Sequence, residues 1–146
     1  MKLIRLLPDQ VMDRWNFIKD CIRRGLPPAV RDDELVLVEI QSKLLVDELI
    51  CWFAMESLES DIVYGVMTTG IITDPFSNTK NLLIYTIATT NAHPDNIWWD
   101  SYIPLRRYAL GQGCKAILAY TNDPRVIEIA KNLGGNVDWN LIQLSV

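Results

Sequence analysis

Histidine and cysteine are scarce in this chain of 146 residues, and their scarcity excludes several kinds of site. His93 is the one histidine, so a single side chain has an unperturbed pKa in the neutral range. Cys21, Cys51 and Cys114 are far apart and form no C-x-x-C pair, which argues against a zinc site and against a disulfide framework. We therefore expect no metal site and three reduced, buried thiols.

Long apolar runs and clusters of basic residues are also missing. No stretch approaches the roughly 20 apolar residues that a membrane span needs. The apolar start of the chain ends at Pro8, which is too short for a signal peptide. A net charge of −4, with scattered lysines and arginines, argues against binding to nucleic acid phosphates. We expect a cytoplasmic protein whose partner is another protein or a small molecule.

Apolar residues make up 49% of the chain, enough for one domain of this length to bury a full core. We expect a single domain over residues 1–146. Apolar runs bounded by turn residues predict strands over residues 2–7, 50–55, 62–73, 82–88, 115–121 and 137–146. Apolar residues at helical spacing predict helices over residues 9–25, 33–46, 95–110 and 123–133. The β-branched residues within 33–46 leave a strand as the alternative there.

The lengths of the connections predict how these strands pair. The three strands between residues 50 and 88 are joined by short turns, so they should form an antiparallel meander, because a parallel crossover needs about a dozen residues or more. A helix separates the strand over 82–88 from the strand over 115–121, so these two should be parallel through a right-handed crossover. We therefore predict an α+β fold with a mixed sheet flanked by about four helices.

The order of these elements, with the segment YALGQGCKAILAYTNDPRVIEIAKNLGG at residues 108–135, resembles the Gcn5-related N-acetyltransferase (GNAT) fold over nearly the whole chain. The resemblance implies an acyl-CoA-dependent N-acyltransferase, or a catalytically degenerate relative, with acetyl-CoA as cofactor and a small amine as substrate. In that family, backbone N–H groups between the fourth strand and the next helix hold the pyrophosphate in a loop of the form R/Q-x-x-G-x-G/A.

The chain departs from the family pattern at three positions. The stretch that corresponds to the loop, residues 86–98, has no glycine, arginine or glutamine, and Pro94 within it lacks an N–H donor. The family's general-acid tyrosine lies four residues before the glycine that matches Gly134, and Ala130 takes that place here. The strand over 82–88 has no carboxylate that could act as a base. The sequence thus predicts the architecture in more detail than the chemistry.

The resemblance also implies a set of cofactor-binding residues. Thr86, Ile87 and Ala88 lie on the fourth strand, where the backbone of the last two would orient the acyl group. Asn96 lies at the start of the next helix, and Asn122 matches a family asparagine that often contacts the cofactor. An enzyme of this kind should keep an open cleft beside this part of the strand, with Tyr85 and Thr86 as a wall of it.

His93 is the candidate catalytic base, because its ring could deprotonate an amine if it lies in that cleft. A polar role in the loop before Pro94 is the simpler interpretation of the same residue.

A non-catalytic structural or adaptor protein is the alternative function. The pairs Tyr108-Ala109 and Gly113-Cys114 resemble a pattern in small GNAT-like proteins encoded by tailed bacteriophages, which implies a virion or assembly component. Such a protein would bind a partner or a second copy of itself. Trp99 and the strand predicted over 137–146 are the candidate contact sites.

Overall fold

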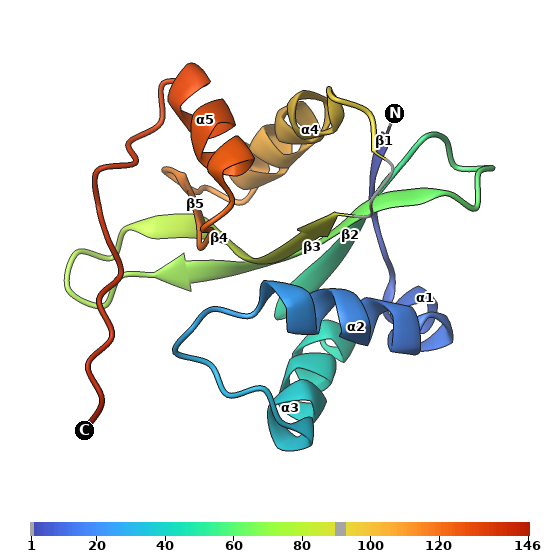
Figure 1. Cartoon of the computed structure of the whole chain (residues 1–146), viewed down its shortest axis with the longest axis horizontal. Coiled ribbons are helices and arrows are strands. Elements are labelled where there is room, and N and C mark those ends of the chain that lie inside the picture. The colour runs from blue at the N-terminus through green and yellow to red at the C-terminus, as the bar shows by residue number, and fades with distance from the viewer. Residues whose placement is uncertain (1, 90–92) are drawn as a thin grey trace.

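The computed structural model describes residues 2–89 and 93–146, which form a five-stranded mixed sheet between two layers of helices (Figure 1). The strands lie in the order β1 (Lys2–Arg5), β2 (Leu49–Met55), β3 (Val63–Thr73), β4 (Lys80–Thr89) and β5 (Ile117–Ala119). The helices are α1 (Pro8–Asp13), α2 (Trp15–Gly25), α3 (Glu34–Leu45), α4 (Ile97–Gly111) and α5 (Pro124–Asn132). Strands β1 to β4 pair antiparallel, whereas β4 and β5 pair parallel. The predicted α+β class, meander and crossover are therefore confirmed.

The first helical segment differs from the prediction of one helix over 9–25. The backbone leaves the helical region at Arg14, with φ −119° and ψ 22°, and separates α1 from α2. Its guanidinium carbon lies 5.8 Å from the ring centre of Phe17 and 5.3 Å from that of Phe53. The break thus places a cation over two aromatic faces, an attraction that helical periodicity does not reveal.

The predicted strand over residues 137–146 is wrong. The described chain forms no helix or strand after α5, and β5 is shorter than the predicted 115–121. Apolar alternation shows that a segment can form a strand, but a strand also needs the backbone of a neighbour with which to pair. None of the described strands pairs with residues 137–146.

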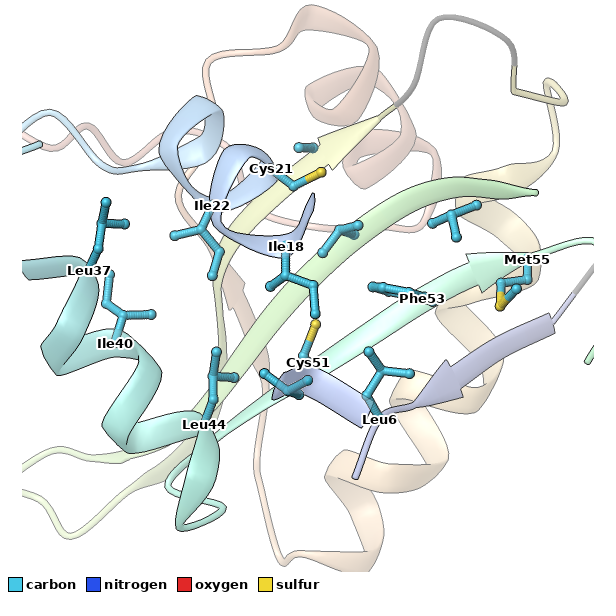
Figure 2. Close-up of a cluster of buried hydrophobic side chains, with 14 residues drawn as sticks. Leu6, Ile18, Cys21, Ile22, Leu37, Ile40, Leu44, Cys51, Phe53 and Met55 are labelled. Carbon is cyan, nitrogen blue, oxygen red and sulfur yellow. The ribbon is translucent and has the colours of Figure 1, made fainter. Parts of the chain in front are cut away.

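The larger core lies between the sheet and the layer formed by α1, α2 and α3 (Figure 2). Ile18 and Ile22 of α2 and Phe53 of β2 are almost fully buried there. The predicted burial of the thiols is confirmed, and Cys21 and Cys51 lie in this core. Burial raises the pKa of the Cys51 thiol to about 12 and also raises the pKa of Cys21.

Helix α3 is apolar on two faces. Its inner face contributes Leu37 and Leu44 to the larger core, whereas Leu35 and Val38 on its outer face are exposed. Apolar side chains exposed together on one face of a helix are unusual on the surface of a monomeric protein. The outer face of α3 is therefore an exposed apolar surface of this chain.

The other side of the sheet carries α4 and a second, smaller core. Trp52 of β2 is at its centre, where its ring meets Tyr108 of α4 edge-on with 5.1 Å between ring centres. The indole Nε1 donates a hydrogen bond of 2.8 Å to the hydroxyl of Thr69. This contact satisfies the polar end of an otherwise apolar side chain.

Strand β4 contains a bulge at Tyr85. Thr68 of β3 pairs with Thr86 and Thr69 pairs with Ile84, so Tyr85 has no partner in the ladder. Tyr85 packs against the larger core, and the Thr86 hydroxyl lies 2.6 Å from that of Thr68 on the same side. Ile87, the residue after Thr86, then lies on the side of α4. A bulge of this kind also bends its strand and increases the local twist.

Candidate cofactor site

The sheet opens between β4 and β5. The two strands pair from Leu82 and Ile117 to Ile84 and Ala119, and no further. The next contact, from the N–H of Tyr120 to the carbonyl of Ile84, is already 3.5 Å long. The second half of β4 therefore has no strand beside it on the β5 side among the described residues. Its backbone N–H and C=O groups on that edge are suited to hydrogen bonds with a ligand.

A cavity of about 280 Å³ lies where the strands separate, between β4, β5, α4 and α5. Its walls include Ile87, Ala88 and Thr89 of β4, Trp98 and Tyr102 of α4, and Ala130 of α5. None of the described lining residues carries a charge, and most are apolar. The space has the composition of a small-molecule site, in which a few polar groups set the orientation of an apolar ligand.

Helix α5 covers the outer side of this cavity. It begins with Pro124, and the side chain of Asp123 caps it by accepting a hydrogen bond of 2.9 Å from the N–H of Arg125. None of its residues is fully buried, although Val126 and Ala130 lie on an apolar stripe. These two residues line the cavity. The apolar stripe from which this helix is predicted therefore faces the cavity and not a packed core.

The first turn of α4 forms the end of the cavity nearest the tip of β4. Trp98 in this turn lines the cavity, and Asn96 occupies the cap position just before it. The Asn96 side chain donates a hydrogen bond of 2.7 Å to Asp100 and does not cap the helix. The N–H of Ile97 in this turn already donates a hydrogen bond of 3.2 Å to the carbonyl of Pro94, and the positive end of the helix dipole favours an anionic group here. Part of the preceding loop, residues 90–92, lies outside the described residues.

The structure places the predicted cofactor residues in different surroundings. Ile87 and Ala88 line the cavity, whereas the Thr86 side chain faces α2 and bonds Thr68. Asn96 lies beside the cavity, and Asn122 is exposed between β5 and α5. The cofactor-binding role of these residues stays a prediction.

His93 is half-buried and does not line the cavity. Its Nδ1 atom lies 3.1 Å from the carbonyl oxygen of Pro94. Because a carbonyl oxygen only accepts hydrogen bonds, Nδ1 carries the proton in this contact, and Nε2 is the acceptor in the neutral ring. Nε2 is therefore the nitrogen that would accept a proton from a substrate, and the role of His93 as a catalytic base stays a prediction.

Two tyrosines lie near the separation of the strands on the side of α1, α2 and α3. Burial raises the pKa of Tyr85, and the nearby Tyr120 raises it further. Tyr85 therefore remains protonated at neutral pH and can donate a hydrogen bond. The sequence predicts Tyr85 as a wall of the pocket, but the bulge turns it to the opposite face. No role for Tyr120 is predicted from the sequence.

Trp98, Tyr102 and Ala130 are site residues that the sequence does not reveal as such. Trp98 and Tyr102 fit the apolar stripe of a packed helix, and Ala130 appears only as a missing tyrosine. No short motif in the sequence marks these three residues as walls of a cavity.

The comparisons with known proteins identify the architecture. No family model matches the chain, and no curated protein matches it by sequence. Solved structures do match over its full length. The aminoglycoside N-acetyltransferase AAC(6')-Iy, in complex with the bisubstrate analogue CoA-S-monomethyl-acetylneamine, superposes with a TM-score of 0.71 at 13% identity, covering 99% of this chain and 97% of that one. The fold is GNAT-like.

Two further matches support this GNAT-like fold. A ribosomal-protein-alanine N-acetyltransferase from Brucella melitensis biovar Abortus 2308 has a TM-score of 0.67 at 11% identity, covering 100% of both chains. An acetyltransferase from Trypanosoma brucei has a TM-score of 0.67 at 10% identity and covers 99% of both. The resemblance predicted from the sequence is therefore confirmed at the level of the fold.

Across residues 2–89 and 93–146, no three histidine, cysteine or acidic side chains lie together as ligands for a metal ion. None of the helices in the same ranges has the length and apolar character needed to cross a membrane.

Proposed function

We propose that this protein binds an acyl-CoA in the cavity between β4, β5, α4 and α5, and that it transfers the acyl group to a small amine. The observation that carries the proposal is the apolar space of about 280 Å³ at the point where β4 and β5 separate. Two of the matching structures of AAC(6')-Iy contain CoA or a CoA bisubstrate analogue.

The residues of the cavity fit the pantetheine arm of CoA better than its pyrophosphate. Ile87, Ala88 and Ala130 would contact the methyl and methylene groups of the arm. The unpaired edge of β4 offers backbone donors and acceptors for its two amides. The first-turn N–H groups of α4 suit a phosphate, but Asp100 in the same turn repels one. We therefore expect the pantetheine arm to supply most of the affinity.

When bound, a CoA thioester supplies the acyl carbon that an amine nitrogen attacks, with cleavage of the carbon–sulfur bond and return of the amine's proton to the thiolate. The described cavity walls contain no carboxylate and no histidine. His93 therefore acts from outside the walls if it accepts the proton. The Tyr85 hydroxyl keeps its proton at neutral pH, because burial raises its pKa, and it is a hydrogen-bond donor on the side of the sheet that faces α1, α2 and α3.

Calorimetric titration with CoA and acetyl-CoA tests the binding step. The cavity-filling variant Ala130→Phe should weaken binding at least tenfold, because its ring occupies space that the ligand needs. Asn132→Phe adds the same ring to an exposed position of α5 and should bind like the wild type. A wild-type protein that gives no heat with millimolar ligand, or two variants with equal affinity, would contradict the proposal.

A second candidate function is a non-catalytic adaptor, and the uncharged walls of the cavity favour it. Release of CoA thiol in the presence of a panel of amines separates the two functions. Acyl transfer that falls in His93→Ala at unchanged acetyl-CoA affinity supports the enzyme. Tight CoA binding without any thiol release supports the adaptor.

A further inference from the structure

The outer face of α3 carries an apolar stripe along the length of the helix. Leu35 is 75% exposed, Val38 58% and Val46 63%. Together with Ser42 they follow one side of the helix at a spacing of three or four residues. The buried residues of α3 lie on the opposite side, toward the sheet (Figure 2). An exposed stripe of this kind marks an interaction site.

The apolar surface continues from α3 onto α1. Met12 of α1 is 48% exposed, and its sulfur lies 3.4 Å from the side-chain nitrogen of Gln41 in α3. Leu45, one turn after Gln41, is 37% exposed on the same side of the helix. The stripe and its extension form one surface, the α3 patch, which consists of Met12, Leu35, Val38, Ser42, Leu45 and Val46.

The polar residue within the α3 patch is suited to burial. The Ser42 hydroxyl donates a hydrogen bond of 2.7 Å to the carbonyl of Glu39 in its own helix, so it needs no partner from outside. The side chain of Ser42 is also small. Because the distance between two packed helices depends on the side chains at their contact, a second helix can come close at this point.

Two opposite charges flank the middle of the α3 patch. Glu39 and Lys43 are exposed and one turn apart on the same side of the helix. When two copies of α3 lie antiparallel, Glu39 of each copy lies opposite Lys43 of the other, and Leu35 of each copy meets Val46 of the other. A parallel arrangement would place Glu39 opposite Glu39 and Lys43 opposite Lys43. The patch is therefore complementary to itself in the antiparallel direction.

Helix α4 carries a second exposed apolar stripe, but its charges oppose self-association. Trp99 is 45% exposed, Ile103 56% and Leu110 58%. Arg106 lies within this stripe, between Ile103 and Leu110, and Arg107 is beside it. Two copies paired through α4 would bring these arginines together, which is unfavourable. The pattern of charge therefore favours α3 over α4 as the contact between two copies.

We propose that the α3 patch joins two copies of this protein into a twofold dimer, in which the two α3 helices lie antiparallel and Glu39 of each copy pairs with Lys43 of the other. Both copies use the same surface, so the assembly closes as a dimer. The apolar side chains supply the burial, and the charge pairs set the direction of the helices. The inference does not depend on the proposed function, because α3 and the cavity lie on opposite sides of the sheet.

Sedimentation velocity over a range of protein concentrations tests the interface. The wild type should sediment as a dimer, and Val38→Glu should be monomeric, because it places a charge in the covered part of the patch. Ile103→Glu is the matched control at a similarly exposed position of α4, and it should remain a dimer. Circular dichroism should show the same helix content in both variants and the wild type. A wild type that is monomeric at every concentration would overturn the proposal, as would a dimer that Ile103→Glu abolishes and Val38→Glu does not.

Exchange of the flanking charges tests the antiparallel direction. Glu39→Lys and Lys43→Glu should each raise the dissociation constant of the dimer about tenfold or more, because each places like charges opposite one another. A mixture of the two variants should form a heterodimer, since the lysines of one chain then face the glutamates of the other. The double variant Glu39→Lys/Lys43→Glu should regain the wild-type dissociation constant. If neither the mixture nor the double variant associates, the antiparallel pairing is wrong.

Discussion

Gly25 of α2 packs directly on the backbone of Ile87 in β4. A Cβ atom at Gly25 would come within 3.0 Å of both the nitrogen and the oxygen of Ile87. The neighbouring Arg24 donates a hydrogen bond of 3.2 Å to the carbonyl of Thr89 at the end of the same strand. The end of α2 therefore supports the part of β4 whose other side faces the cavity.

Gly25→Ala should destabilise the protein by about 1 to 3 kcal/mol, because the atoms in its way belong to a strand and cannot turn aside. Gly111→Ala is the matched control, since it also replaces the last residue of a helix but meets nothing within 4 Å. It should leave the free energy of unfolding equal or raise it by about 0.4 to 1 kcal/mol. Equal effects in urea unfolding would show that the close approach has no energetic importance.

The buried threonine pair gives a prediction about the bulge. Thr68 accepts a hydrogen bond of 3.2 Å from the N–H of Thr86 in addition to its contact with the Thr86 hydroxyl. Thr68→Val should therefore lower the free energy of unfolding by more than Thr86→Val, since it leaves a buried backbone donor unpaired, at about 1 to 3 kcal/mol. Urea unfolding of both variants checks the order. Equal losses would show that the bulge donor finds another partner.

Much of the fold follows from local patterns. Helix α5 appears within the predicted range 123–133, and the strands of the meander appear where apolar runs predict them. The break at Arg14 does not follow, because its cause is a contact with Phe53 in a distant strand. The bulge at Tyr85 is hidden for another reason: a continuous apolar run has no alternation from which an extra residue could be read.

The candidate site could be predicted only in part. The backbone order indicates where the strands separate, and Ile87 and Ala88 lie at that place. The remaining walls, such as Trp98 and Ala130, are set by how far α4 and α5 stand from the sheet. That distance results from the packing of many side chains and leaves no short motif in the sequence.

Cys51 should make the protein less stable at alkaline pH. Its pKa of about 12 in the folded state is higher than the value of about 8.5 expected for an unfolded thiol. Below the unfolded value both states hold the proton. Between the two values only the folded state does, so stability falls as pH rises, by about 1.4 kcal/mol per pH unit.

Urea unfolding of the wild type and Cys51→Ala between pH 7 and pH 10 measures this effect. Cys51→Ala costs a constant amount for its lost packing, so the difference between the two curves should shrink above about pH 8.5. Parallel curves would mean that the Cys51 thiol titrates normally in the folded protein. Cys21, whose pKa is also raised, keeps some of the slope in both proteins.

The bulge at Tyr85 changes the course of β4 next to the cavity but leaves the pairing of the rest of the strand unchanged. Because Thr68 and Thr69 already pair with Thr86 and Ile84, a strand without Tyr85 would run in unbroken register with β3. Every other side chain of β4 would keep its present face, but the strand would lose the bend that precedes its departure from β5. The single surplus residue thus supplies a bend in β4 next to the point where it leaves β5, and its loss would straighten the strand and remove one side chain from the margin of the larger core.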